Sequence, residues 1–288
     1  MTELAEKLAR VRRWLDATGF GAALFTSQPG VAWVTGGLED RVVRNEEPGL
    51  AWALVTASGA HLITTSIEAA RLLAEADLDG LTLHAVAWHD PGGLAGAVER
   101  LAQDEGGLTG AGPKLATDGA GPGTAVPGEL AALRLPLVAA EHERLAALGA
   151  DTAEVLQDAL RDWIPTEREC DLAARIAAAL EERLVFPSVL LVGGARRRRA
   201  FRHPVPTAAV TGPDVLAVVT GVRGGLTVSC SRSAAYADAG FPGEWREHVQ
   251  GGPVGYPAEQ LRQAAVIAVT NTPDWPATAD GRPDILRV

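Results

Sequence analysis

Apolar residues in the first half of the chain recur at helical spacing and then at strand spacing. Leu4, Leu8, Val11 and Leu15 lie on one face of a predicted helix, which Gly19 is suited to end in a left-handed conformation. Shorter apolar runs between turn signals predict strands, and the stretches between them predict further helices. The predicted strands cover 22–26, 50–56, 61–65 and 81–87, and the predicted helices cover 66–77 and 91–103. This alternation predicts an α/β domain with a mixed sheet.

Local turn and cap signals add detail to this domain. The Gln-Pro-Gly segment at 28–30 is predicted to form a turn after the first strand. The Ser-Gly pair at 58–59 is predicted to join the second and third strands in a hairpin. Ser66 is predicted to cap the helix that follows the hairpin.

The second half of the chain begins with helical spacing and continues with strands. A long apolar stripe predicts a helix over 139–163, which Pro165 ends. Thr166 and Glu169 have the spacing of a capping box, so Thr166 is predicted to be the N-cap of a second helix. A Gly-Gly turn at 224–225 is predicted to join two strands in a hairpin. The strands predicted in this half cover 188–192, 214–221 and 226–232.

Composition and charge narrow the class of protein. The chain has 288 residues, of which 47% are apolar, and this is enough for the core of one or two domains. A net charge of −10 argues against general affinity for nucleic acid or anionic membranes. No apolar run has the length of a membrane span, and the amphipathic N-terminus does not fit a signal peptide. Cys170 and Cys230 lack metal-ligand spacing, so we expect reduced thiols and a cytoplasmic location.

Three segments of the second half follow a recognisable order. Residues 201–207 read Phe-Arg-His-Pro-Val-Pro-Thr, and the strands at 214–221 and 226–232 follow them. This layout resembles the family of creatinase, prolidase and aminopeptidase P, the "pita-bread" hydrolases. The family's matching segments contain a histidine, then Val-Asp-x-Gly, then Ser-Asp-x-Thr-Arg. Placed over them, the histidine is kept as His203 and the arginine as Arg232, whereas the two metal-binding aspartates fall on Val219 and Ser229.

The resemblance continues toward the C-terminus. Residues 245–256 look like the family's His-Gly-x-Gly segment, in which the position of the third metal ligand is Val249. Glu259 is the sole carboxylate close enough to consider as one of the two glutamates of the family's site. Valine supplies no metal ligand and serine only a neutral hydroxyl, so we expect no metal and no other cofactor. The alignment needs a one-residue gap in the turn at 221–225, but neither Val228 nor Cys230 would restore an aspartate.

The resemblance implies a fold as well as a site. It predicts a creatinase-type N-terminal α/β domain over 1–136 and a shortened pita-bread domain over 137–288, with the boundary after the Gly- and Pro-rich segment. About twelve residues separate Arg232 from Trp245, where the family carries a long helix. Because deletion of that helix exposes apolar sheet, we expect the shortened domain to bury this face in a homodimer.

Some chemistry is still available without a metal. In creatinase, a metal-free member of the family, the histidine at the position of His203 acts as the acid/base, and His248 is the second candidate here. The alternative for His203 is a simple hydrogen-bonding role in its loop. Five arginines gather at 196–199 and 202, which suits a carboxylate ligand or else a solvated surface. The candidate ligand-binding residues are Arg199, Arg202, Arg232 and Tyr256.

Three functional hypotheses follow from these residues. The first is a peptidase-related protein that has lost Xaa-Pro hydrolysis and binds a small peptide, a carboxylate or a protein partner. The second is a metal-independent hydrolase or lyase that uses His203 as acid/base. The third is a structural remnant that dimerises with a full-length relative.

Overall fold

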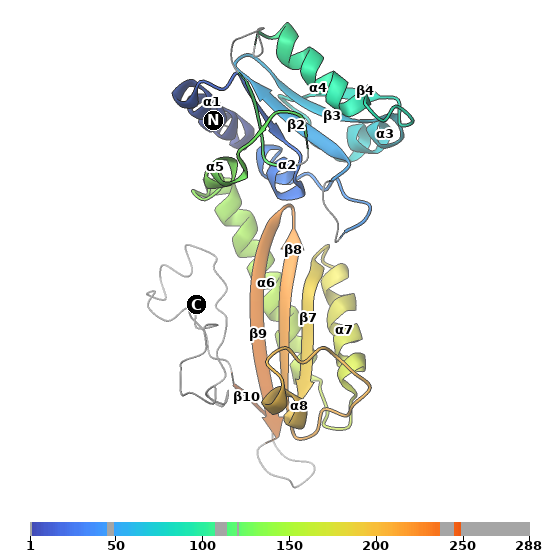
Figure 1. The fold of residues 1–288 in the computed structure, drawn as a ribbon. Helices are drawn as coiled ribbons and strands as arrows, with labels where there is room; N and C mark the ends of the chain where they lie inside the picture. The colour runs from blue at the N-terminus through green and yellow to red at the C-terminus, as the bar shows by residue number, and fades with distance from the viewer. Residues whose placement is uncertain (1, 45–48, 107–113, 120, 237–244, 249–288) are drawn as a thin grey trace. The chain divides into compact units, whose positions relative to one another are not determined.

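The computed structural model describes residues 2–44, 49–106, 114–119, 121–236 and 245–248, the last four by their backbone alone. The chain divides into two units, residues 1–141 and 142–288 (Figure 1). Each unit has its own sheet and its own apolar core. None of the described helices is long and apolar enough to cross a membrane.

The first unit is built on a six-stranded mixed sheet with the strand order β4-β3-β2-β1-β5-β6. The pairs β1/β2 and β2/β3 are antiparallel, and the other three pairs are parallel. The predicted mixed sheet is therefore confirmed. Its strands are β1 (Ala22–Phe25), β2 (Ala51–Thr56), β3 (Ala60–Thr65), β4 (Thr82–Val86), β5 (Leu115–Thr117) and β6 (Thr124–Ala125).

Helices cover both faces of this sheet. One core joins residues of α1, α2, α3 and α5 to one face, and a second core joins α4 to the opposite face (Figure 1). The predicted stripe of α1 is buried as expected, and Gly19 ends the helix with a φ of 77°. The helices are α1 (Glu3–Thr18), α2 (Gln28–Val34), α3 (Ser66–Glu75), α4 (Gly93–Asp104) and α5 (Pro127–Ala132).

Two local predictions for the first unit are wrong. Residues 28–30 begin α2 instead of forming a turn, because the Oγ of Ser27 accepts a hydrogen bond from the Gly30 N–H at 3.1 Å and caps the helix. Pro29 is compatible with this start because the first helical turn needs no donor from it. Ser66 is the first residue of α3, and Thr65 is its N-cap.

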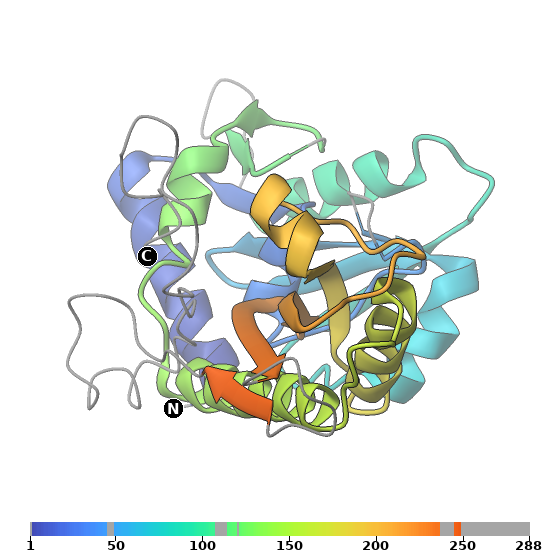
Figure 2. The ribbon, with the colours of Figure 1, turned by 90° about the horizontal axis from the view of Figure 1, so that it is seen from below.

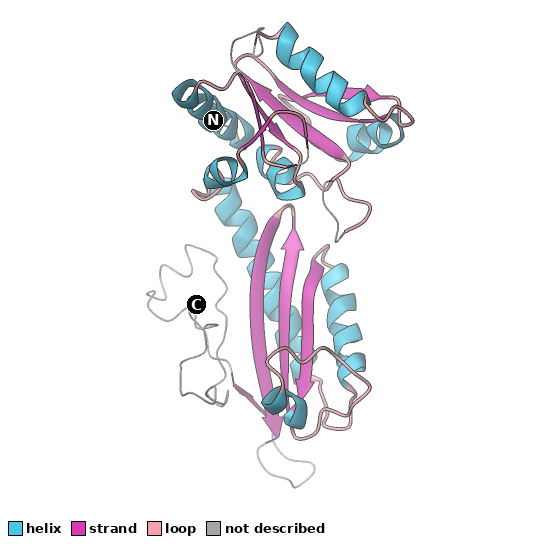
Figure 3. Ribbon diagram, in the orientation of Figure 1, coloured by secondary structure: helices cyan, strands magenta, loops and turns pink. Residues whose placement is uncertain are grey.

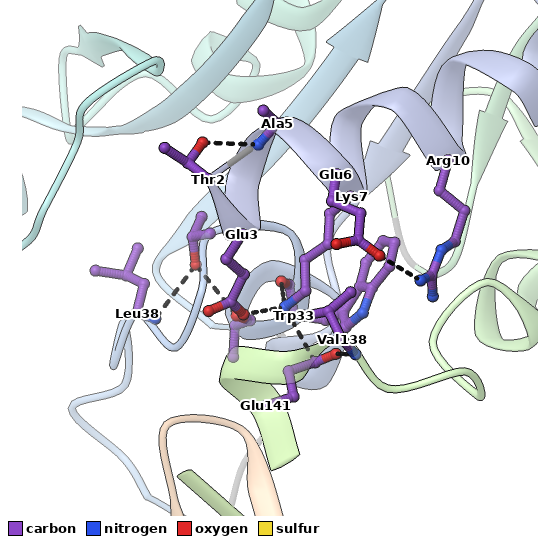
Figure 4. Close-up of polar contacts among 12 residues, drawn as sticks. Thr2, Glu3, Ala5, Glu6, Lys7, Arg10, Trp33, Leu38, Val138 and Glu141 are labelled. Atoms are coloured by element: carbon purple, nitrogen blue, oxygen red, sulfur yellow. Dashed lines mark hydrogen bonds and ion pairs between the residues drawn. The ribbon is translucent and has the colours of Figure 1, made fainter. Parts of the chain in front are cut away.

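A buried lysine ties the start of α1 to the end of the first unit (Figure 4). The Nζ of Lys7 lies 2.6 Å from a carboxylate oxygen of Glu3, 3.0 Å from one of Glu141 and 2.6 Å from the carbonyl oxygen of Trp33. Lys7 is fully buried and Glu141 is 2% exposed. Three partners satisfy the three donors of the ammonium group, which is the condition for burying it.

The second unit is built on an antiparallel sheet with the strand order β10-β9-β8-β7. Its strands are β7 (Phe186–Gly194), β8 (Asp214–Arg223), β9 (Leu226–Tyr236) and β10 (Trp245–His248), and its helices are α6 (Ala139–Arg161), α7 (Glu169–Glu181) and α8 (Ala195–Ala200). A single apolar core joins α6 and α7 to one face of β7, β8 and β9. Figure 2 shows these elements from the end of the strands.

Helix α7 begins two residues later than predicted. Arg168 is its N-cap and Glu169 is its first residue, so Thr166 is not the N-cap. The carboxylate of Glu169 is fully buried and binds residues far along the chain instead of a neighbouring N–H of its own turn. A tertiary contact has thus replaced the local capping box.

The hairpin between β8 and β9 has the predicted two-residue turn. Gly224 and Gly225 have φ values of 55° and 73°. Positive φ at both central residues is the requirement of a type I′ turn, which glycine meets without strain. The turn sets a regular register from Asp214↔Ala235 to Arg223↔Leu226.

One buried carboxyl group in the first unit, that of Asp40, forms no ion pair with the described residues. Asp40 is fully buried, and its Oδ2 accepts a hydrogen bond from the Ala51 N–H at 3.2 Å. Its Oδ1 has no hydrogen-bond partner in the described part of the chain. Burial, the largest effect, raises the pKa of Asp40 to about 6, although the bond from Ala51 acts in the opposite direction.

We expect Lys7→Met to reduce the free energy of unfolding by about 3 kcal/mol, because Glu141 would stay buried without its counter-charge. Urea unfolding followed by tryptophan fluorescence measures this loss. Lys114→Met is the matched control, since Lys114 is exposed, and its effect should stay within about 0.5 kcal/mol. A loss below about 1 kcal/mol for Lys7→Met would contradict the stabilising role of this cluster.

We expect the stability of the protein to fall as pH rises from 4 to 7 by roughly 2 kcal/mol on account of Asp40. The folded state holds the Asp40 proton up to about pH 6, whereas the unfolded state has already released it, so rising pH favours unfolding. Asp40→Asn should remove this part of the pH dependence and be more stable than the wild type at pH 7.5. Urea titrations at several pH values test this, with exposed Asp16→Asn as control. Identical pH slopes for the wild type and Asp40→Asn would contradict it.

Candidate functional site

The two faces of the β8–β9 hairpin differ in chemistry. On the side of α6 and α7, Val219 stands opposite Cys230, and both side chains are fully buried in the apolar core. Burial, the largest effect, raises the pKa of the Cys230 thiol, and nearby Arg232 lowers it less. A thiol with a raised pKa stays protonated at neutral pH and is a poor metal ligand. On this face of the hairpin, the positions of Val219 and Cys230 therefore offer no metal ligand.

The opposite side of the hairpin carries a row of hydroxyl groups. We call this row the hydroxyl face, and it consists of Thr220, Ser229, Ser231 and Ser233. The hydroxyl oxygens of Thr220 and Ser229 lie 2.9 Å apart and form a hydrogen bond across the strands. Ser231 and Ser233 are buried, and the Oγ of Ser233 has no hydrogen-bond partner among the described residues. The hydroxyl face is polar but uncharged.

The structure separates the positions that the family alignment paired. Val219 and Ser229 lie on opposite faces of the hairpin, because Val219 stands opposite Cys230 and Ser229 opposite Thr220. The one-residue gap in the turn explains this, since a slip of one residue exchanges the two faces of a strand. Two side chains on opposite faces of a sheet do not converge on one ion. These residues do not fit the dinuclear metal that the resemblance implies for the family.

The strand predicted over 226–232 does not end at Arg232. Strand β9 continues past it to Tyr236, and Arg232 stands opposite Ala217 on the side of the apolar core. Its Nη1 donates to the carbonyl oxygen of Ser231 at 3.2 Å and lies 3.5 Å from the Sγ of Cys230. Arg232 is thus on the face opposite to Ser229 and the other hydroxyl groups.

The loop that carries His203 crosses the ends of β7 and β8 (Figure 3). Pro204 is buried against Gly193, where a Cβ would come within 2.5 Å of the proline ring. The His203 side chain is exposed, and none of the described residues forms a hydrogen bond or ion pair with its ring. The structure places this candidate acid/base in solvent beside the sheet.

Strand register relates the two candidate histidines. Gly193, Leu216, Ser233 and His248 form one transverse row across β7, β8, β9 and β10. The His203 loop lies at the β7 end of this row and His248 at the β10 end, and three strand spacings separate β7 from β10 by about 14 Å. The Thr220–Ser229 pair is four residues further along β8, or roughly 13 Å. The two histidines are therefore separate from the Thr220–Ser229 pair.

Glu169 holds the His203 loop in place. Its carboxylate accepts hydrogen bonds from the Gly194 N–H at 2.9 Å, from the Nε of Arg197 at 2.9 Å and from the Thr207 hydroxyl at 2.7 Å. The Thr207 N–H adds a bond at 3.1 Å. This buried carboxylate therefore joins the start of α7, the end of β7, α8 and the loop. The sequence spacing predicts only a capping role for Glu169.

Four arginines of the cluster, at 196–199, lie in a short helix, α8. Arg198 and Arg199 both donate to the carboxylate of Asp214, the latter at 2.8 Å. Arg197 binds Glu169 and lies over the ring of Phe201. At least three of the five guanidinium groups therefore have partners within the unit. The side chains of Arg196 and Arg202 are exposed to solvent.

Several predicted residues lie outside the described part of the chain. These are Val249, Tyr256 and Glu259, and of His248 only the backbone is described. Within the described residues, no group of three or more His, Cys, Asp or Glu side chains is arranged to hold a metal ion. The roles given to His203, His248, Arg199, Arg202 and Tyr256 stay predictions.

Comparisons with known proteins identify the fold. No family model matches the sequence, and no curated protein matches it significantly. Solved structures do match. The prolidase from Pyrococcus horikoshii OT3 is 12% identical with a TM-score of 0.57, and the match covers 79% of this chain and 64% of that one. The Xaa-Pro dipeptidase from Bacillus anthracis is 16% identical with a TM-score of 0.58, covering 83% of this chain and 66% of that one.

A third similar structure is the X-Pro aminopeptidase from Thermotoga maritima MSB8. It is 12% identical with a TM-score of 0.61, and the match covers 81% of this chain and 66% of that one. The chain thus spans slightly less than two thirds of the length of these structures. The predicted creatinase and pita-bread fold is confirmed, and the chain has the α/β fold of prolidases and X-Pro aminopeptidases.

Proposed function

We propose that this protein has the fold of an Xaa-Pro peptidase without the metal-dependent activity, and that it binds a small ligand carrying a carboxylate, such as a short peptide. The observation that carries the proposal is the register of the β8–β9 hairpin. At the level of the family's ligands, one face presents Val219 and Cys230 and the other presents Thr220 and Ser229. Neither face carries a carboxylate or an imidazole there.

The carboxylates that the second unit does place near this sheet already have partners. Asp214, the one acidic residue of β8 and β9, accepts bonds from Arg198 and Arg199. Glu169 has its two oxygens occupied by backbone and side-chain donors. Recruiting either of them to a metal would break buried ion pairs, which is costly.

Positive charge supports an anionic ligand. Five guanidinium groups gather at 196–199 and 202 in a chain with a net charge of −10, and three of them, those of Arg197, Arg198 and Arg199, bind the carboxylates of Glu169 and Asp214. Arg196 and Arg202 are exposed beside the loop of His203. A guanidinium group recognises a carboxylate by two parallel hydrogen bonds. This cluster is therefore the best-supported ligand surface of the described chain.

We expect the purified protein to show no hydrolysis of Ala-Pro or Gly-Pro above the metal-ion blank when it is supplied with Mn²⁺, Co²⁺ or Zn²⁺. The physical reason is that the hairpin lacks ligands that converge on an ion. Proline release measured by chromatography checks this. Activity that a chelator abolishes and metal restores would contradict the proposal. Retained activity that His203→Ala abolishes, without sensitivity to a chelator, would favour the metal-independent hydrolase instead.

Binding tests the other half of the proposal. We expect Ala-Pro to raise the unfolding midpoint of the protein, whereas the C-terminal amide of Ala-Pro, which lacks the carboxylate, does not. The double variant Arg196→Gln, Arg202→Gln should weaken Ala-Pro binding at least about tenfold, because charged hydrogen bonds are lost. Arg13→Gln is the matched control, since Arg13 is exposed in the other unit. Equal affinity for the peptide and its amide would contradict a carboxylate ligand.

A further inference from the structure

Two histidines and a glutamate form a chain of contacts in the first unit, away from every residue discussed above as a site. The Nδ1 of His61 on β3 lies 3.1 Å from the Nε2 of His84 on β4. The other ring nitrogen of His61, Nε2, lies 2.9 Å from a carboxylate oxygen of Glu105. Glu105 follows directly after α4. The three side chains come from three separate elements of the fold.

Glu105 determines which nitrogen of His61 is free to bind a cation. A carboxylate accepts hydrogen bonds, so the Nε2 of His61 must carry the proton in this contact. In the neutral ring the lone pair is then on Nδ1, which points toward His84. Glu105 itself accepts bonds from the hydroxyl groups of Thr56 and Ser58, the latter at 3.2 Å. Hydrogen bonds with His61 and with the two hydroxyl groups therefore hold the Glu105 carboxylate in place.

We propose that the Nδ1 of His61 and the Nε2 of His84 bind a divalent transition-metal ion such as Zn²⁺, Co²⁺ or Ni²⁺, with Glu105 as the positioning residue of His61. Two imidazole nitrogens at the usual metal distance of ~2.0–2.1 Å in a tetrahedral site are about 3.3 Å apart. The observed 3.1 Å needs only a small opening of the pair. A ligating histidine that donates its other N–H to a held carboxylate is the common arrangement in metal sites.

The backbone supports this geometry. His61 and His84 lie on adjacent parallel strands, in which Ile63 pairs with His84. Ile63 is fully buried in the core under α4. Gly59 leaves the room that the cluster needs, because a Cβ there would lie 2.4 Å from Glu105 and 2.5 Å from the Nε2 of His61. Any other residue at position 59 would push the His61–Glu105 pair apart.

Ligand chemistry selects the class of cation. Imidazole nitrogen suits Zn²⁺, Co²⁺ and Ni²⁺, whereas Mg²⁺ and Ca²⁺ take oxygen ligands. No third His, Cys, Asp or Glu completes the set within the described residues. The remaining coordination positions therefore belong to water, and the site is open to an exchangeable ligand.

The test is titration of the full-length protein with ZnCl₂ by calorimetry, with the unfolding midpoint measured in parallel. We expect Zn²⁺ to bind and to raise the midpoint, and Ca²⁺ to do neither. His84→Gln should weaken the Zn²⁺ affinity at least tenfold and remove the midpoint shift. Glu105→Gln should weaken the affinity by roughly 10-fold to 100-fold, because the amide fixes His61 less well. With Co²⁺, nitrogen coordination should give visible absorption bands that His84→Gln removes.

Controls separate this site from other histidines. His89→Gln is the matched variant, since His89 is exposed nearby in the sequence, and it should leave the Zn²⁺ affinity unchanged. The unfolding midpoint of each variant, measured without metal, shows whether that variant folds. If His84→Gln does not fold, the Zn²⁺ affinity of Glu105→Gln tests the proposal in its place. An absence of Zn²⁺ binding, or binding that neither His84→Gln nor Glu105→Gln changes, would overturn the proposal and leave the His61–His84 contact as an ordinary hydrogen bond.

Discussion

The Gly224-Gly225 turn determines the chemistry of the second unit. A two-residue turn with positive φ at both positions allows one register between β8 and β9. That register assigns each side chain of the hairpin to the apolar core or to the hydroxyl face. A turn longer by one residue would exchange these assignments along one strand. Glycine can adopt the positive φ that this turn needs. The turn thus decides which side chains of β8 and β9 stand opposite each other on the order of five residues away along each strand, more than about 10 Å from the turn itself.

In this register the described side chains of the hairpin need no cation to neutralise them. A dinuclear site requires several carboxylates close together, which repel each other and lose hydration unless a metal ion neutralises them. Val219 and Cys230 carry no charge and pack against α6 and α7 instead. The Thr220 and Ser229 hydroxyl groups satisfy each other. At these four positions the described side chains are therefore held by apolar packing and a hydroxyl contact.

Much of the fold is predictable from the sequence because local patterns agree with it. The apolar stripe of α1, the hairpin of β2 and β3 and the Gly-Gly turn are signals within a few residues of each other. The exceptions depend on distant partners. Thr166 and Glu169 have the spacing of a capping box, yet the Glu169 carboxylate instead binds Gly194 and Thr207, which are 25 and 38 residues away. Local spacing shows no sign of such partners.

The candidate sites follow the same rule. Residues 196–199 and 202 look like a solvated charge run, and only the structure shows that Asp214 and Glu169 bind three of these arginines. His61 is 23 residues from His84 and 44 residues from Glu105 in the sequence, so the three residues form no motif. Strand pairing brings the histidines together, and the end of α4 brings the carboxylate to them. A sequence motif reveals a site when its residues are neighbours on one element. A site assembled from three elements becomes visible only when their register is known, as it is here for both sheets.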